Sequence, residues 1–345
     1  MGEQAVIAHA DAHVDGQHVD HGHDEKALPV EEEQRGQRAH VKQQDDGERN
    51  PIHAFANRGG AAHADLLAQV QGIACFGVAA PRELCYCDRS PSCWRREDES
   101  VILCSVELEV ELRGKCPHSR LIVVMDARAS YIDLLRNLLE SGHVEVSSLI
   151  QRPFGVASTA KIGVHSHIHP EARIDDDVVL GTNCTIHRGV WIQKGAKIGD
   201  GAVIGAPGIN AYVSRDGRQL DFPHPAGVVV GEGAFIGANA VVMRGILTST
   251  KIGTLSTIGN LCNIGHGVVL GEKCWMSVGC LIGGHTSIGD GATLGMGVTV
   301  RDNLKIGEKS QIGMGSVVVR KIDARASVFG NPARAVTAIK AGPSR

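Results

Sequence analysis

A six-residue repeat constrains this chain more than any other feature of its sequence. Aliphatic side chains return at every sixth position in three series, and Gly often follows them. The series are Ile162, Ile168, Ile174, Leu180, Ile186, Ile192, Ile198 and Ile204, then Val230, Ile236 and Val242, then Ile252, Ile258, Ile264, Leu270, Met276, Ile282, Ile288, Leu294, Val300, Ile306, Ile312 and Val318. This period predicts a parallel β-helix in which each hexad forms one short strand and one turn.

The repeat also predicts the dimensions of the fold. Three hexads close one coil, so each aliphatic residue stacks on its counterpart eighteen residues away. Because neighbouring strands lie about 4.8 Å apart, seven to eight coils give a prism roughly 36 Å long. The Gly that follows the inward residue is expected to relieve a tight corner, where a positive φ is common.

Two interruptions break the rhythm. Residues 205–229, "GAPGINAYVSRDGRQLDFPHPAGVV", are rich in Pro, Gly and polar side chains and are expected to loop out of the prism. Such loops carry function more often than the coils themselves. The second interruption is a four-residue slip between Val242 and Ile252.

The sequence before the repeat divides in two. Residues 1–64 are polar and rich in His, so they cannot bury enough apolar area to offset the entropy of ordering, and we predict a disordered or non-native extension without function. Residues 65–150 contain the β-rich runs "SVILCSVELEV" and "RLIVVMD", and then "ASYIDLLRNLLES" with helical spacing. We therefore predict a small α/β domain, a β-helix domain over 155–322 and a short tail over 323–345.

Composition excludes several classes of partner. The formal net charge is −3 and no segment gathers Lys and Arg, so a nucleic-acid partner is not expected. No apolar leader or membrane-length apolar run is present in the sequence, which favours a cytoplasmic protein with free thiols and no membrane span. Cys85, Cys87 and Cys93 lack the paired C-x2-C spacing of a zinc site, so no metal is expected.

Three runs together resemble the UDP-3-O-acylglucosamine N-acyltransferases of lipid A synthesis. They are "LIVVMDARASYIDLLRNLL", "IGAPGINAYVSRDGRQLDFPHPAGVVVGEGAFIGANAVVMRG" and "IGNLCNIGHGVVLGEKCWMSVGCLIGGHTSIGDGATLGMG". The resemblance covers about residues 72–320. It implies a left-handed β-helix, a homotrimer, no tightly bound cofactor, and transfer of a hydroxyacyl chain from acyl carrier protein to the amine of a UDP-amino sugar.

The resemblance places the catalytic histidine of the family on His266. Aminolysis of a thioester needs the attacking amine to lose a proton, and imidazole has a pKa near neutrality. One coil further on lies Gly284, which resembles the position whose backbone N–H stabilises the tetrahedral oxyanion. Without the resemblance, an exposed turn residue is the favoured interpretation of His266, since polar residues are ordinary at coil corners.

Other candidates surround this pair. Asn260 and Asn263 precede His266 in sequence and are expected to contact polar groups of the substrate. His285 follows Gly284 and is a weaker candidate for the same role. The family places a second histidine thirty-seven residues after the catalytic one, and here that position is Asn303, which weakens its assignment to diphosphate or acceptor contacts.

The small domain resembles the uridine-binding domain of the family at "RELCYCDRSPSCW". An aromatic pair sandwiches the base in that family, and Tyr86 and Trp94 are the candidates here. The alternative is that both rings belong to the core of the small domain.

Two other functions stay open. The C-terminal run "ASVFGNPARAV" resembles the tail of nucleotide-sugar acetyltransferases that use acetyl-CoA, so the acyl donor is either acyl carrier protein or a coenzyme A thioester. A non-catalytic β-helix used for structure or binding is the third interpretation. His266 and Gly284 argue against it, because a scaffold needs neither.

Overall fold

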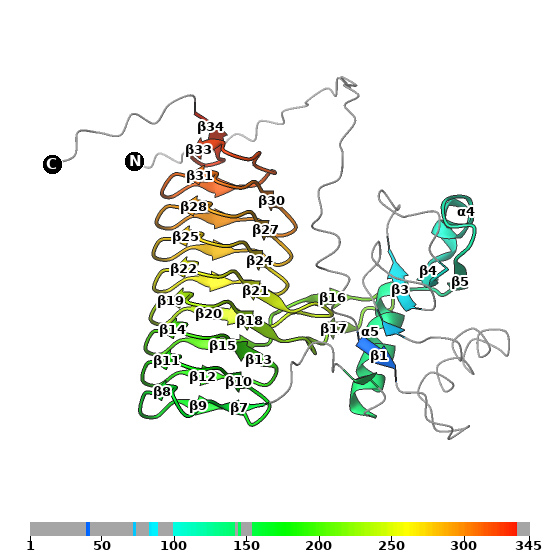
Figure 1. Ribbon diagram of the computed structural model, residues 1–345. Coiled ribbons are helices and arrows are strands. Elements are labelled where there is room, and N and C mark those ends of the chain that lie inside the picture. Colours follow the sequence, from blue (N-terminus) through cyan, green and yellow to red (C-terminus); the bar gives the residue numbers. More distant parts are fainter. Residues whose placement is uncertain are drawn as a thin grey trace, which may run out of the picture.

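The computed structural model describes residues 83–88, 99–141 and 154–336, together with the backbone of three short strands at 39–41, 72–73 and 144–145. It confirms the predicted fold class, a mainly β chain built on a left-handed parallel β-helix with a small α/β unit before it. Figure 1 shows the prism of stacked coils and, beside it, the small unit. No helix in these described ranges is long and apolar enough to cross a bilayer.

The prism has three faces of parallel strands. The first face contains β7 (Gly155–Val156), β10 (Arg173–Ile174), β13 (Val190–Ile192), β18 (Val228–Val230), β21 (Thr250–Ile252), β24 (Val269–Leu270), β27 (Ser287–Ile288) and β30 (Lys305–Ile306). The second contains β8 (Lys161–Ile162), β11 (Val179–Leu180), β14 (Lys197–Ile198), β19 (Phe235–Ile236), β22 (Thr257–Ile258), β25 (Trp275–Met276), β28 (Thr293–Leu294), β31 (Gln311–Ile312) and β33 (Ser327–Phe329), with β34 (Arg334–Ala335) antiparallel at its end. The third contains β9 (His167–Ile168), β12 (Thr185–Ile186), β15 (Val203–Ala206), β20 (Val241–Met243), β23 (Asn263–Ile264), β26 (Leu281–Ile282), β29 (Thr299–Val300) and β32 (Val317–Val318).

The predicted register holds where the repeat is unbroken. Ile258 pairs with Met276, and Met276 pairs with Leu294, so inward residues stack at a step of eighteen and are fully buried. At the two interruptions the step changes: Ile204 pairs with Val242 and Val242 pairs with Ile264. The regular stack is therefore interrupted at both predicted places, and the strands resume in phase after each.

The glycine that follows the inward residue has a different role from the one predicted. A methyl group on Gly259 would lie 2.6 Å from the carbonyl carbon of Ser277 in the next coil, and Gly259 does not have a positive φ. The left-handed backbone lies two residues further along, as at Gly279 with φ of +71°. The first glycine is needed because two coils approach closely, and only the second sits where the turn itself needs positive φ.

The large insertion forms a hairpin. Strands β16 (Ala211–Val213) and β17 (Gln219–Asp221) pair antiparallel and extend from the prism towards the small unit (Figure 1). Phe222, just after β17, packs against Tyr86 and Tyr131 of the small unit, with ring centroids 6.1 Å and 5.8 Å away. The hairpin thus packs the two parts together, and Ile246 and Leu247 from the second interruption belong to the same apolar cluster.

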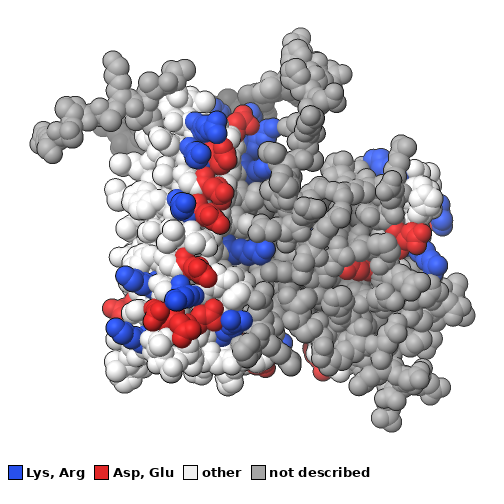
Figure 2. All heavy atoms as spheres, in the orientation of Figure 1, with Lys and Arg blue, Asp and Glu red and all other residues white. Residues whose placement is uncertain are grey.

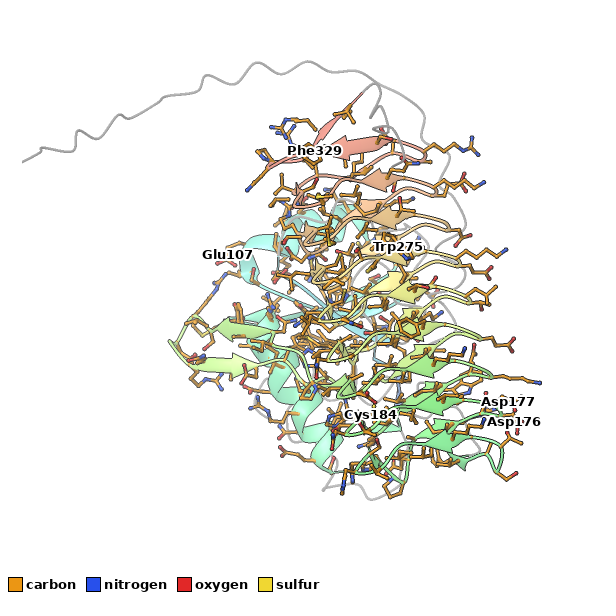
Figure 3. The ribbon with its side chains drawn as sticks, turned by 90° about the vertical axis from the view of Figure 1, so that its left-hand side faces the viewer. Glu107, Asp176, Asp177, Cys184, Trp275 and Phe329 are labelled. Atoms are coloured by element: carbon orange, nitrogen blue, oxygen red, sulfur yellow. The ribbon has the colours of Figure 1, made fainter. Side chains whose placement is uncertain are left out.

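Polar contacts fix the same junction. Asp126 caps helix α5 (Ala127–Glu140) by accepting a hydrogen bond from the Ala129 amide at 2.9 Å. The same carboxylate accepts bonds from the Tyr212 hydroxyl and the Arg215 amide of the hairpin. Figure 3 shows Glu107 beside the hairpin, where its carboxylate accepts a bond from the Arg215 guanidinium at 2.8 Å.

The small unit departs from the predicted elements at one place. Its sheet has the order β5 (Arg120–Val123), β4 (Val101–Cys104), β3 (Glu83–Cys87), β2 (Gly72–Ile73), β1 (Ala39–Val41), β6 (Val144–Glu145). The second half of the run expected to be β-rich is helix α4 (Val106–Lys115). Its alternation of apolar and acidic residues imitates a strand, but Glu109–Arg113 and Glu111–Lys115 pair across one helical turn.

The predicted domain limits differ from the elements at both ends. Strand β1 lies inside residues 1–64, and the other residues of that predicted extension lie outside the described ones. At the other end, β33 pairs with β31, so the last coil continues beyond the predicted limit at residue 322.

The two glycine roles predict different costs of substitution. Gly259→Ala should lower the thermal midpoint clearly, because its methyl group would meet the backbone of the next coil, at a cost of about 1 to 3 kcal/mol. Gly279→Asn should have a small effect, because a methyl group there meets nothing within 4 Å and Asn already occupies this turn position at Asn239. Equal midpoints for the two variants would contradict this assignment.

Candidate functional site

Three imidazole rings meet at one edge of the prism, which we call the third corner. It consists of the turns that lead from the third face to the first. His266 stands in the turn after β23, and its ring centroid lies 4.7 Å from that of His285, in the turn after β26. On the other side of His266 the ring of His224, from the large insertion, lies 5.1 Å away. Both contacts are edge-to-face.

The backbone around His266 is fixed by neighbouring coils. The amide of His285 donates to the carbonyl of His266 at 2.8 Å. The Thr250 hydroxyl, from the coil before, accepts from the Gly267 amide at 2.9 Å and donates to the Met243 carbonyl at 2.7 Å. The turn that carries His266 is therefore held on both sides.

Gly284 lies directly against the His266 ring, as the sequence predicts for residues one coil apart. A methyl group on Gly284 would stand 2.8 Å from both Cε1 and Nε2 of His266. Within the described part of the chain, no group accepts a hydrogen bond from the Gly284 amide. The site thus offers an imidazole nitrogen beside a backbone N–H donor that has no acceptor.

The environment keeps His266 neutral near pH 7. Burial lowers the pKa of His266, and the negative charge of Asp302 opposes this shift. Because a base must be unprotonated to act, the lowered pKa favours proton acceptance at neutral pH. Nδ1 of His266 is buried and has no hydrogen-bond partner among the described residues.

The two flanking histidines are also held neutral. Burial, followed by the charge of His266, lowers the pKa of His224 to about 4. The same two causes lower the pKa of His285 to about 4, although the residue as a whole is exposed to solvent. The three imidazole rings can together carry little positive charge, because protonation of one ring disfavours protonation of its neighbours.

Sequence reasoning missed His224 and Asp302. His224 lies in the run "DFPHPAG", at the end of an insertion whose path the hexads do not predict. Asp302 stands two residues after the inward Val300, the same turn position that His266 takes after Ile264, so the eighteen-residue step could have revealed it.

The other polar residues predicted to contact substrate are Asn260, Asn263 and Asn303, and they do not all lie at the third corner. Asn263 lies on β23 itself and precedes the inward Ile264. Asn303 follows Asp302 in the turn after β29, where its amide nitrogen donates to the Asp302 carboxylate at 2.7 Å. Asn260 lies in the turn after β22, at a different corner of the prism, and its side chain accepts a bond from the Ala238 amide at 2.9 Å, which is a structural contact between coils.

Of the predicted aromatic pair, only Tyr86 lies among the described residues. Tyr86 lies on β3 and packs on Tyr131 with ring centroids 4.9 Å apart, within the apolar cluster that joins the small unit to the hairpin. This packing favours the core interpretation for Tyr86. Trp94 lies outside the described residues.

The thiols of the small unit lie in its interior. Cys85 and Cys87 are buried with Cys104 and Cys116 around Leu112. Cys93 lies outside the described residues. Among the residues that the structure describes, no group of three or more His, Cys, Asp or Glu side chains could hold a metal ion.

Comparison with known proteins confirms the predicted resemblance. Two family models match: "Bacterial transferase hexapeptide (six repeats)" at residues 285–320, and "Hexapeptide repeat of succinyl-transferase" at residues 171–207. A UDP-3-O-acylglucosamine N-acyltransferase of Coxiella burnetii is 26% identical over 245 residues, which cover 62% of this chain and 68% of the relative. The protein of the same name from Shewanella denitrificans is 33% identical over 103 residues, covering 30% of this chain and 26% of its own.

A solved structure also matches. The UDP-N-acetylglucosamine acyltransferase from Campylobacter jejuni is 23% identical, with a TM-score of 0.35, over 54% of this chain and 73% of its own. The named sequence relatives are N-acyltransferases, so the chain is assigned to the acyltransferases.

The histidine cluster predicts how stability changes with pH. The pKa of His224 is near 4 in the folded chain and near 6.5 when unfolded, so the unfolded chain binds more protons between these values. Stability should be fully present above about pH 6.5 and should fall as the pH drops towards 4. We expect the thermal midpoint to decrease between pH 7 and pH 5.

The matched variant is His224→Gln, which removes one of these titrating groups and keeps a polar side chain. Its midpoint should change less between pH 7 and pH 5 than that of the native chain. An identical pH dependence would contradict the burial of a neutral His224.

Proposed function

We propose that this acyltransferase of the hexapeptide-repeat type moves an acyl group from a thioester carrier to the amine of a UDP-amino sugar, as in lipid A synthesis. The observation that carries the proposal is the pair formed by His266 and Gly284. A neutral, half-buried imidazole lies against a glycine whose amide has no acceptor in the described chain. The names of the sequence relatives support the same substrate class.

The geometry suggests the following steps. His266 takes a proton from the amine as the amine nitrogen attacks the thioester carbonyl carbon. The carbonyl oxygen becomes an oxyanion and accepts a hydrogen bond from the Gly284 amide, which is already in place and needs little reorganisation. The carbon–sulfur bond then breaks, and the imidazolium returns the proton to the leaving thiolate. The products are an amide and a thiol.

Nε2 is the nitrogen that we assign to the base. It belongs to the edge of the ring nearest Gly284, whereas Nδ1 is buried. His285 packs against His266 and contributes to burial at this site, so we assign it a supporting role. His224 takes the same role from the opposite side.

Two thiol carriers fit the donor. The coils resemble the UDP-3-O-acylglucosamine N-acyltransferases, which implies acyl carrier protein as the donor. The C-terminal run resembles the tail of acetyl-CoA-dependent acetyltransferases, which implies a coenzyme A thioester. Both deliver the acyl group on a thiol, so the proposed steps are the same for either. The assay is therefore to incubate the chain with UDP-linked amino sugars and either acetyl-CoA or hydroxyacyl carrier protein, and to read the products by mass. Absence of an amide product with every pair would refute the proposal.

We also propose that the chain works as a homotrimer. Large apolar side chains are exposed in the turns after the second face, including Val278, Met296 and Met314, and Leu281 is exposed on the third face. Charged side chains instead form a column along another edge of the prism (Figure 2), where Asp176 and Asp177 project in Figure 3. An apolar row of this kind favours burial against neighbouring copies.

The proposed reaction predicts a large effect of replacing His266. His266→Ala should lower kcat by about a hundred-fold or more, on the scale expected for a positioned base, with little change in KM. The fold should survive because the side chain stands outside the aliphatic stack. His285→Ala is the matched control, since it removes a neighbouring imidazole, and it should lower kcat much less. Similar losses in the two variants would contradict the assignment of the base.

The proposed trimer predicts the effect of placing charge in the apolar row. Replacing Met296 and Met314 together by Lys should dissociate it, because two charges would be buried in an apolar interface. Leu255→Lys is the control, since Leu255 is equally exposed but lies at the charged edge. Sedimentation should give trimers for the native chain and the control. A native chain that sediments as an active monomer would refute the proposal.

A further inference from the structure

A second group of basic side chains occupies the third corner, on the N-terminal side of His266. Arg244 stands two residues after the inward Val242, the turn position that His266 takes in the next coil. Arg188 holds the same position after Ile186, and His187 lies between Ile186 and Arg188 in sequence. This corner therefore presents, in coil order, Arg188, Arg244, His266 and Gly284.

Arg244 folds back towards His187. Its amide donates to the Ala206 carbonyl at 2.9 Å, and its Nε donates to the Gly205 carbonyl at 2.6 Å. Gly205 in turn lies on His187, because a methyl group on this glycine would stand 3.2 Å from the Cβ of His187. The guanidinium is thereby fixed over the coil that separates it from Arg188 and His187.

The charge of Arg244 has no acidic partner. In the described part of the chain no carboxylate lies within ion-pair distance of its guanidinium. The acidic group of this neighbourhood is Glu171, whose carboxylate is 3.1 Å from Arg188, with both side chains about half exposed at 44% and 46%. Arg188 is thus partly neutralised and open to solvent, whereas Arg244 is a half-buried cation without a counter-ion.

The positive charges of Arg244 and Arg188 repel each other, and this repulsion costs free energy. Burial and then the charge of Arg188 lower the pKa of Arg244, even though arginine loses its proton with great difficulty. Burial and then Arg244, His167 and His169 lower the pKa of His187. A bound anion would remove this repulsion, and guanidinium groups match the geometry of phosphate oxygens.

We propose that Arg244, with Arg188 and His187, binds a phosphate group of the nucleoside diphosphate in the acceptor. This inference rests on the proposed function and deepens it, because it assigns a direction to the substrate along the third corner. The phosphates lie on the Arg244 side of His266, and the thioester carbonyl lies on the Gly284 side. Adjacent coils are about 4.8 Å apart. One sugar can therefore carry both the phosphate that binds Arg244 and the amine that reaches His266.

The charge of Arg244 influences the histidine cluster that contains the base. The positive charge of Arg244 contributes to the lowered pKa of His224, and the His224 ring lies 5.1 Å from that of His266. A methyl group on Gly208 would stand 3.0 Å from His224 Nε2 and 3.1 Å from His266 Cδ2, so the insertion packs on both rings. The charge of Arg244 therefore reaches the catalytic cluster, and the insertion packs on both His224 and His266.

The test is the binding of UDP, uridine and coenzyme A to the full chain, measured by titration calorimetry. Arg244→Gln should weaken UDP binding at least ten-fold and leave uridine binding unchanged, because uridine has no phosphate. Arg320→Gln is the matched control: Arg320 is exposed and takes the equivalent turn position after Val318 in a distant coil. It should bind UDP like the native chain.

Two further variants keep the test decisive. Arg244→Lys retains the cation and should recover part of the UDP affinity. If Arg244→Gln does not fold, Arg188→Gln replaces an exposed side chain and should still weaken UDP binding measurably. Native UDP affinity in whichever glutamine variant folds would overturn the subsite. Weakened coenzyme A binding with native UDP binding would overturn its assignment to the acceptor.

Failure of this inference is separable from failure of the proposed function, because binding is measured without transfer. A chain that binds UDP through Arg244 but forms no amide refutes the reaction and keeps the subsite. A chain that forms the amide with Arg244→Gln at native UDP affinity refutes the subsite alone.

Discussion

The pairing of each coil with the next is the constraint on which the rest of the structure depends. Inward residues such as Ile264 and Ile282 stack on each other because their strands pair in register. The same register brings residues in equivalent turns together, so His266 lies against Gly284 and follows Arg244 along one corner. The chemistry of the site is thus arranged by the core, through a repeat that has no catalytic meaning of its own.

The large insertion adds what the repeat cannot supply. Its hairpin contributes Tyr212 and Phe222 to the junction with the small unit, and its return segment places His224 against His266. Burial of His266 therefore depends on a segment outside the coils. A change at this junction would be expected to alter the environment of the base without touching the prism.

Sequence reasoning predicted the parts that repetition controls. The three series of hexads follow from the six-residue period, the looped-out segment from the break in that period, and the neighbourhood of His266 and Gly284 from the step of eighteen residues. It failed where local patterns are ambiguous, as in α4, whose alternating Glu residues imitate a strand. It also missed His224, because nothing in "DFPHPAG" indicates which coil the chain meets on its return, and it assigned to one glycine the positive φ that belongs to the residue two places further along.

The central claim is that His266 acts as a neutral base in acyl transfer to an amine. The most direct measurement is the dependence of kcat on pH with saturating UDP-amino sugar and donor, because this profile reports ionisations in the bound complex. We predict that kcat falls at low pH through a single ionisation below the ordinary histidine value of about 6.5, and that the residual rate of His266→Gln lacks this ionisation. The same ionisation in the variant, at a comparable rate, would contradict the claim.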